Sequence, residues 1–310
     1  MARPLSGLAR REARWAYVFL LPWLIGLVVF QAGPMVASLV LSLTDYDLIS
    51  SPRFVGLGNY AEMLEDPKVA TAIGNTAFYT VLHVPLALVV SLALALMLNR
   101  VTGRAAGFFR TAFYLPSMTP YVAVGVLFLF LLNGQAGLVN QFLGLFGVDG
   151  PQWTTDPAWV KPGVVLMSLW NLGSTTIILF AALRNVPRDL YEAAMIDGAG
   201  PWQRFRSVTL PMISSALFFV VIINTIAALQ MFDQVYTMFF GNQTAQNSYG
   251  DAALFYVVYL FQQGFQFLHM GYASALAWLL FAIIAVITVV QVKVGNRLVY
   301  YEAEPPGGTR

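Results

Sequence analysis

Six apolar stretches, each long enough to cross the hydrocarbon core of a bilayer, dominate this sequence of 310 residues. A membrane-spanning helix needs about 20 apolar residues, because hydrocarbon offers no hydrogen-bond partner to a bare backbone. The six stretches are Trp15–Leu43, Thr71–Leu98, Thr111–Leu132, Gly163–Leu183, Leu210–Phe232 and Tyr272–Val292. A seventh, Ala252–Phe261, has only ten residues, so we expect it to lie at the membrane interface or to dip into the membrane rather than to span it. The sequence therefore predicts an all-α membrane protein with six transmembrane helices.

Composition supports a membrane protein and excludes several kinds of function. Hydrophobic residues make up 58% of the chain and charged residues 10%, against about 45–50% and about 25% in ordinary soluble domains. The net charge of +2 is too small to indicate nucleic-acid binding, and the lack of cysteine excludes disulfides and thiolate metal sites. His83 and His269 stand on separate segments, each without a metal-ligand partner, so we expect no metal site.

The distribution of basic residues predicts the orientation and the domain division. Fourteen of the 17 basic residues fall on one side of the predicted spans, whereas only Arg53, Lys68 and Lys161 fall on the other. Because loops rich in lysine and arginine stay in the cytoplasm, both termini are expected there. We divide the chain into a basic N-terminal segment (1–14), a transmembrane domain (15–295) and a C-terminal tail (296–310), with a cytoplasmic connector at 185–211.

The connector between the fourth and fifth spans has the pattern of a helix, a glycine turn and a second helix. Asn185 is placed to cap the first helix, Pro187 suits its first turn, and Leu190–Ile196 forms its body. Gly198 takes the left-handed conformation that stops this helix, and a second one follows over Trp202–Val208. We therefore expect an elbow lying across the membrane surface.

The residue types of this elbow indicate a docking surface. Ala193 and Ala194 let a partner approach the backbone, and Glu192 with Asp197 supplies charge at the rim. Three large apolar side chains are expected on the wet face: Tyr191, Met195 and Phe205. Such an elbow fits a cleft on a soluble partner, in the manner of a helix in a groove. The alternative is an ordinary loop folded back on its own spans.

The motif E-A-A-x-x-D-G-A, which begins at Glu192 and precedes T-L-P at Thr209, resembles the cytoplasmic loop of membrane subunits in ATP-binding-cassette (ABC) importers. Five further stretches resemble the carbohydrate-uptake branch of that family, the maltose, glycerol-phosphate and lactose type: FVGLGNY (Phe54–Tyr60), NTAFYT (Asn75–Thr80), FFRTAFYLP (Phe108–Pro116), LRNVPRDLYEAA (Leu183–Ala194) and FDQVYTM (Phe232–Met238). The likeness covers roughly residues 15–295. Gly241-Asn242-Gln243 departs from the family, which usually has a Gly-Gly-Pro turn there.

This resemblance implies a type I importer permease fold in the bacterial inner membrane and a division of labour. A second homologous permease subunit, two ATP-binding subunits and an external solute-binding protein would complete the transporter. By analogy, Glu192 would pair with a basic group of the ATPase, and the other coupling positions would fill or shape the contact: Tyr191, Ala193, Ala194, Met195, Ile196, Asp197, Gly198, Ala199 and Phe205. The chain has no G-x-x-x-x-G-K-[ST] motif. We therefore expect no cofactor and no enzyme activity in this chain, with ATP and Mg on the partner subunits.

Two predicted spans carry polar residues at helical spacing, which marks a cavity or a helix contact. The fourth span has Met167, Trp170, Asn171 and Ser174 on one expected face; the fifth has Asn224, Ala227, Ala228 and Met231, with Gln230 beside them. Amides, a hydroxyl and an indole ring suit a sugar, and the family's cavity is lined by these two helices. The alternative is that Asn171 and Asn224 join helices to one another. For Asp233, at the outer end of the fifth span, we expect a structural hydrogen bond.

Other classes of function fit less well. An ion-coupled secondary transporter needs ionisable groups inside the membrane and usually an inverted repeat, whereas the six spans carry one peripheral aspartate, Asp233, and show no repeat. Glycerol 3-phosphate, carried by some relatives of this type, would call for an arginine in the spans, and none is present. The sequence therefore favours import of a neutral mono-, di- or oligosaccharide by alternating access.

Overall fold

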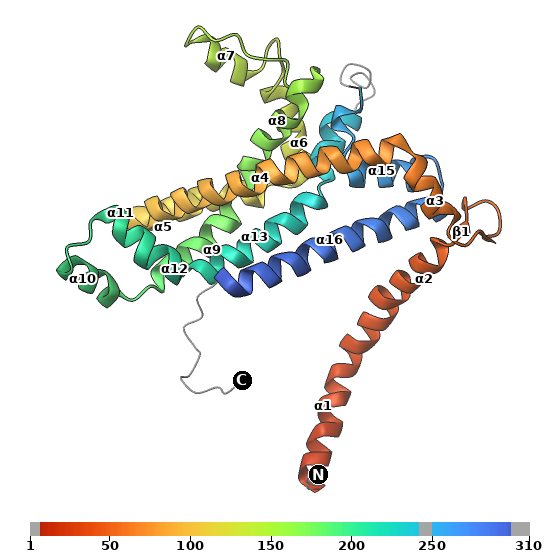
Figure 1. The fold of residues 1–310 in the computed structure, drawn as a ribbon, viewed down its shortest axis with the longest axis horizontal. Coiled ribbons are helices and arrows are strands. Elements are labelled where there is room, and N and C mark those ends of the chain that lie inside the picture. Colours follow the sequence, from red (N-terminus) through yellow and green to blue (C-terminus); the bar gives the residue numbers. More distant parts are fainter. Residues whose placement is uncertain (1–6, 242–249, 299–310) are drawn as a thin grey trace. The chain divides into compact units, whose positions relative to one another are not determined.

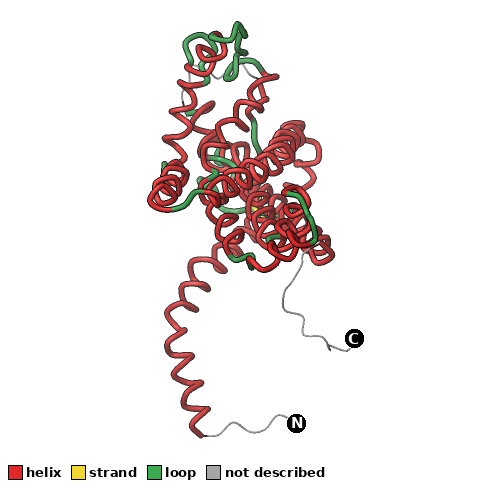
Figure 2. Tube along the Cα trace, turned by 90° about the vertical axis from the view of Figure 1, so that its left-hand side faces the viewer, coloured by secondary structure: helices red, strands yellow, loops and turns green. Residues whose placement is uncertain are grey.

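The computed structural model describes residues 7–241 and 250–298, and most of them are helical (Figures 1 and 2). The chain divides into two compact units: Met1–Glu65 with Leu260–Phe281, and Asp66–Tyr259 with Ala282–Arg310. Three sequence predictions fall wholly or partly outside the described residues. They concern the N-terminal segment 1–14, the C-terminal tail 296–310 and the turn at Asn242 and Gln243.

The first unit contains a long helical segment followed by a small hairpin. Its elements are α1 (Gly7–Gly26), a π-helix (Leu27–Ala32), α2 (Gly33–Leu41), β1 (Thr44–Asp45), β2 (Arg53–Phe54), α3 (Gly58–Glu65), a second π-helix (Gln262–Gln266) and the first turns of α16 (Met270–Leu298). The Asn59 side chain donates to the backbone carbonyls of Ser42 (2.8 Å) and Thr44 (2.9 Å), just beyond the end of α2. This amide supplies donors to carbonyls that a helix end leaves unpaired.

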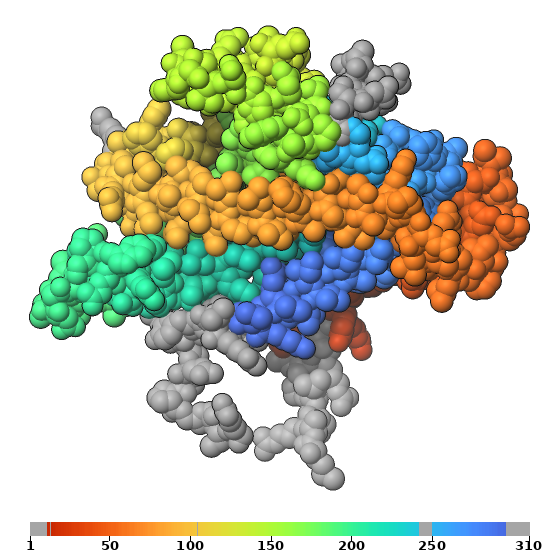
Figure 3. Space-filling model, turned by 45° about the horizontal axis from the view of Figure 1, so that its top comes forward, coloured from red at the N-terminus to blue at the C-terminus, as the bar shows by residue number. Residues whose placement is uncertain are grey.

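The second unit is built around α4 (Pro67–Arg100), a continuous helix of 34 residues. The elements that follow are α5 (Gly103–Tyr114), a 3-10 turn (Leu115–Met118), α6 (Tyr121–Leu131), α7 (Leu138–Gly144), α8 (Pro157–Ser168), a 3-10 turn (Leu169–Asn171), α9 (Gly173–Arg184), α10 (Arg188–Ile196), α11 (Pro201–Arg204), a π-helix (Phe205–Thr209), α12 (Leu210–Met212), α13 (Ser214–Leu229), α14 (Asp233–Val235), a π-helix (Tyr236–Phe240), a 3-10 turn (Gly250–Ala253) and α15 (Tyr256–Phe261). Helix α4 packs against α8, α9 and α13, and Figure 3 shows it in orange against the green segment that contains α8.

Three of the six predicted spans are continuous helices, and three are bent. By length and composition, Arg14–Leu41, Pro67–Arg100 and Met270–Gly295 are each able to cross a membrane. Three bent pairs supply the others: Ala105–Met118 with Tyr121–Leu131 (94°), Pro157–Asn171 with Gly173–Arg184 (52°) and Pro201–Met212 with Ser214–Leu229 (67°). The described chain thus holds up to six spans, as the sequence predicts.

Two of the bends have identifiable causes. At the break between α5 and α6, Pro120 has no backbone donor, and Thr119 before it is extended (φ −72°, ψ 129°). At the break between α8 and α9, a Cβ on Gly173 would lie 2.6 Å from the Phe113 carbonyl oxygen, so only glycine permits this approach. Pro85, by contrast, lies inside α4 without interrupting it.

The seventh apolar stretch is largely buried in the protein, which accounts for its hydrophobicity and leaves its predicted place at the membrane interface a prediction. Phe255 and Val258 are fully buried in the same core cluster as Val164 of α8. Asn75 of α4 donates to the carbonyls of Asp251 (2.8 Å) and Leu254 (3.0 Å). These bonds tie the stretch to α4, and its hydrophobicity reflects packing within the second unit rather than contact with lipid.

Candidate functional site

The first arm of the connector is α10, and its start differs from the prediction. Pro187 is the N-cap residue, with extended backbone angles (φ −59°, ψ 135°), rather than part of the first turn. Asn185 does not cap α10, because it ends the preceding helix α9 instead. Asp189 lies in the first turn of α10, where a carboxylate faces the positive end of the helix dipole. The body of the predicted helix is confirmed over Leu190–Ile196.

The turn at Gly198 is a Schellman motif. The Gly198 backbone has φ +78°, the left-handed region in which glycine is favoured. Its N–H donates to the Met195 carbonyl (3.0 Å), and the Ala199 N–H donates to the Ala194 carbonyl (2.9 Å). These two bonds satisfy the last carbonyls of α10 and fix the direction in which the chain leaves it. The predicted glycine stop is therefore present.

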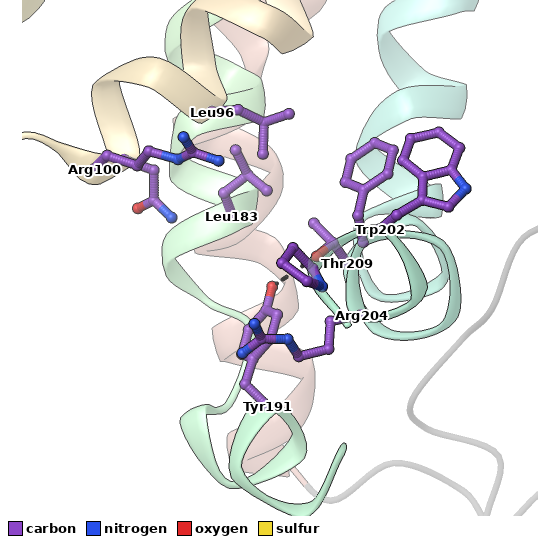
Figure 4. Close-up of a pocket in the computed structure, with 10 residues that line it drawn as sticks. Leu96, Arg100, Leu183, Tyr191, Trp202, Arg204 and Thr209 are labelled. Carbon is purple, nitrogen blue, oxygen red and sulfur yellow. Dashed lines mark hydrogen bonds between the residues drawn. The ribbon is translucent and has the colours of Figure 1, made fainter. Parts of the chain in front are cut away.

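The second arm is longer than predicted, running from Pro201 to Met212 as α11, a π-helical turn and α12. One hydrogen bond joins the two arms: the Tyr191 hydroxyl lies 3.0 Å from Oγ1 of buried Thr209 (Figure 4). On the second arm the rings of Trp202 and Phe205 stack with their centroids 5.5 Å apart. The elbow is thus a braced structure rather than a loose loop.

The outer face of the elbow carries apolar side chains, but not all of the predicted ones. No residue of α10 is buried, Ile196 is 87% exposed and Met195 is 51% exposed. Glu192, Ala193, Asp197 and Gly198 are also exposed, whereas Tyr191, Ala194, Ala199 and Phe205 are half-buried. Of the three apolar side chains predicted on the wet face, Met195 is exposed, whereas Tyr191 and Phe205 are only partly exposed. Trp202, which is 71% exposed, was missed because the loop motif does not include it.

A second feature of the unit is a cavity of about 290 Å³ among α4, the two bent spans around α8–α9 and α13, and residues 230–234. Six of the predicted substrate-path residues line it: Asn171, Asn224, Ala227, Ala228, Gln230 and Met231. All but one come from the fifth span and its outer end. The residues predicted to share a face of α13, and those just after it, therefore line one cavity.

The face predicted on the fourth span does not exist as one surface. Met167 is fully buried in the hydrophobic core, Trp170 packs its ring edge-on to Phe128, and Ser174 is exposed outside the cavity. The reason is the 52° bend at Leu169–Asn171, which ends the helical periodicity that put these residues on one side. Of the four residues predicted there, only Asn171 lines the cavity.

The two asparagines that line the cavity differ in their hydrogen-bond partners. Within the described chain, neither the side-chain nitrogen nor the side-chain oxygen of Asn171 has a hydrogen-bond partner, although both atoms are buried. Asn224 donates to the Val220 carbonyl (2.9 Å) and to Oγ1 of Thr175 on α9 (3.3 Å). Asn224 thus joins two helices as well as lining the cavity, whereas a buried amide such as Asn171 needs a ligand or water to satisfy it.

Several cavity residues were missed by the sequence reasoning. Tyr79 of α4 donates to Ser168 Oγ (2.8 Å), and His83 stacks on the Tyr79 ring with the centroids 5.0 Å apart. The four-residue spacing of these two side chains within an apolar span was the available signal. Asp233, expected to make a structural hydrogen bond, is exposed and lines the same cavity. The structure describes no group of three His, Cys, Asp or Glu side chains that could hold a metal ion.

Up to six apolar helical spans, a cavity with polar walls among them and a braced elbow at their end define a subunit of a membrane transporter. A family model described as binding-protein-dependent transport system inner membrane component matches residues 87–300. The chain belongs to this family, and it is a multi-pass protein of the bacterial inner membrane.

Similar proteins extend this result over nearly the whole chain. A probable ABC transporter permease of Bacillus subtilis, YesP, is 36% identical, with 95% of this chain and 94% of that protein covered. The lactose transport system permease LacF of Rhizobium radiobacter is 35% identical, with 89% and 92% covered. The fold matches a chain of a bacterial ABC transporter that imports the acidic polysaccharide alginate, with a TM-score of 0.80, 24% identity and coverage of 94% and 98%.

Proposed function

We propose that this chain is a permease subunit of an ABC importer that carries a neutral sugar inward. The observation that carries the proposal is the cavity, whose wall combines amide groups with the aromatic rings of Tyr79, Tyr121 and Phe232. Sugar hydroxyls need hydrogen-bonding groups, and sugar C–H faces pack on aromatic rings. No lysine or arginine lines this cavity in the described chain, so a phosphorylated or acidic sugar would find no cationic partner.

The elbow is the proposed contact with a separate ATPase. Exposed Met195 and Ile196 would enter an apolar groove, while exposed Glu192 would pair with a basic group at its rim. The ATPase subunits would hold ATP and Mg, a second permease subunit would complete the path, and an external binding protein would deliver the sugar. Both termini would lie in the cytoplasm, on the side of the elbow.

The bracing of the elbow supports a mechanism of alternating access. The Tyr191–Thr209 hydrogen bond joins α10 to the helical segment that leads into α13, and α13 lines the cavity. ATP-driven closure of the motor would move the elbow, and the elbow would move the walls of the cavity. Binding of the motor at the elbow would thus shift the equilibrium between two conformations of the cavity.

Replacement of Glu192 by lysine tests this coupling. Because the change puts a like charge against the proposed basic partner, we expect sugar uptake to be lost while the chain still inserts into the membrane. Uptake of labelled sugar by cells, with membrane insertion followed by immunoblot, is the measurement. The matched control is Glu62→Lys on α3, the same charge reversal at an exposed position far from the elbow in sequence. Normal uptake by Glu192→Lys would contradict the coupling role.

A further inference from the structure

A second cavity, of about 560 Å³, lies between the C-terminal end of α4 and the elbow (Figure 4). Leu96, Asn99 and Arg100 of α4 line it, together with Leu183 of α9 and with Trp202 and Arg204 of α11. Tyr191 and Phe205, two of the predicted coupling residues, line it as well, so it borders the proposed ATPase contact. Its composition differs from that of the substrate cavity, because the charged side chains that line it in the described chain are two arginines.

The two arginines have no acidic partner in the described chain. The only ion pair there joins Arg53 to Asp45 at 2.9 Å, and no Asp or Glu lines the cavity. The Nε–H group of Arg204 is buried and donates to no acceptor among the described residues. Leaving a buried guanidinium N–H unpaired is costly, so an anionic acceptor in the cavity would relieve the cost. Arginine is also the side chain best suited to bind phosphate oxygens.

The remaining wall shows which kind of anion fits. Leu96 and Leu183 present apolar surface near the Arg100 side chain, whereas the Trp202 ring points away from both guanidinium groups (Figure 4). A free phosphate ion would leave this surface in contact with water, whereas a phospholipid would cover it with an acyl chain. Arg100 is the last residue of the 34-residue helix α4, two residues beyond the predicted span Thr71–Leu98 and at the end expected in the cytoplasm.

We propose that this cavity binds the phosphate headgroup of an anionic phospholipid, with Arg100 and Arg204 on the phosphate and the acyl chain along the apolar wall. Basic pockets between membrane helices on the cytoplasmic side are suited to such headgroups. The bound lipid would bridge α4 and the elbow, and so stabilise their spacing. The inference rests on the cytoplasmic position of the elbow, but not on which solute is carried.

Lipid retention by the purified transporter assembly tests this proposal. The assembly is equilibrated with equal amounts of phosphatidylglycerol and phosphatidylcholine of identical acyl chains, and retained lipids are counted by native mass spectrometry. We expect the wild type to retain phosphatidylglycerol in excess. Arg100→Gln and Arg204→Gln should each lower this excess about fivefold, and Arg100→Lys and Arg204→Lys should keep most of it.

The matched control is Arg206→Gln, which removes one positive charge two residues from Arg204 at an exposed position outside the cavity. It should leave the excess unchanged. An equal loss with Arg206→Gln would overturn the proposal, since general surface charge would then explain retention. Displacement of phosphatidylglycerol by excess inorganic phosphate alone would also overturn it, because a water-soluble anion would then be the ligand.

Discussion

At the scale of single residues, the two asparagines of the cavity allow two roles, substrate contact and helix-to-helix contact, to be tested separately. Asn224 already bonds to Thr175 across a helix contact, so its loss disturbs packing and the cavity together. Asn171 lines the cavity and has no partner in the described chain, so its replacement breaks no hydrogen bond there. Asn171 is therefore the sharper probe of substrate binding, although the two residues were predicted alike from the sequence.

We expect Asn171→Leu to lower sugar uptake severalfold without lowering the thermal stability of the chain, because an unsatisfied buried amide is replaced by an apolar group. Asn224→Leu should lower uptake or shift substrate preference. Thr175→Val removes the helix-to-helix bond and leaves the Asn224 amide in place. Initial uptake rates and melting temperatures of the three variants are the measurements. If Thr175→Val reproduces the full effect of Asn224→Leu, Asn224 acts as a helix contact and not through the substrate.

Gly198 permits a second prediction at this scale, since its φ of +78° is unfavourable for any residue with a Cβ. We expect Gly198→Ala to destabilise the end of α10 by about 1 kcal/mol and to reduce coupled transport. Gly200→Ala is the matched control: a Cβ at either glycine meets nothing within 4 Å, but Gly200 has φ −67°. Uptake measured beside ATP hydrolysis reports the coupling. Equal effects of the two substitutions would show that coupled transport does not depend on the left-handed conformation of Gly198.

At the scale of elements, the bends decide which side chains meet. Four-residue spacing would place Met167 and Asn171 on one face of a continuous helix. Because of the 52° break at Leu169–Asn171, Asn171 lines the cavity while Met167 lies in the core. That break accommodates the close approach of Gly173 to the backbone of Phe113 and Tyr114 on α5. A contact between segments 60 residues apart in sequence thus shapes the cavity wall.

Gly173→Ala should therefore be strongly disruptive. Its Cβ would lie 2.6 Å from the Phe113 carbonyl oxygen and 2.9 Å from the Tyr114 Cα, both of them backbone atoms that cannot move aside cheaply. We expect a loss of about 1–3 kcal/mol in stability, typical of overpacking. The control is Gly74→Ala in α4, where a Cβ meets nothing within 4 Å. Thermal unfolding in detergent compares them, and equal stability of the two variants would contradict the packing argument.

The same contact explains what could and could not be predicted from the sequence. Length and hydrophobicity depend on local composition, so the spans and the glycine turn of the elbow were predictable. The bend before Gly173 depends on tertiary approach, so the face containing Trp170 and Ser174 was predicted wrongly. The burial of Ala252–Phe261 was not predicted for a related reason, because hydropathy does not distinguish contact with lipid from contact with the core. The burial of Phe255 and Val258 and the hydrogen bonds of Asn75 show the contact with the core.

At the scale of the whole molecule, the orientation in the membrane is still a prediction from charge. The lack of cysteine makes it testable, since a single introduced thiol is the only one in the chain. Ser50→Cys lies at an exposed hairpin position on the predicted outside, and Ser207→Cys lies at an exposed position on the elbow. We expect a membrane-impermeant maleimide to label Ser50→Cys in intact cells, and to label Ser207→Cys only after the cells are opened. The reverse pattern would invert the topology.

The lack of any buried residue in α10 has a consequence for the biology of the isolated chain. Ile196, Met195 and Trp202 present their side chains to solvent in a subunit that stands alone, and surfaces of this kind attract chaperones and proteases. We therefore expect an orphan copy to be short-lived in the cell. Matched synthesis of all the subunits would then limit how much transporter accumulates.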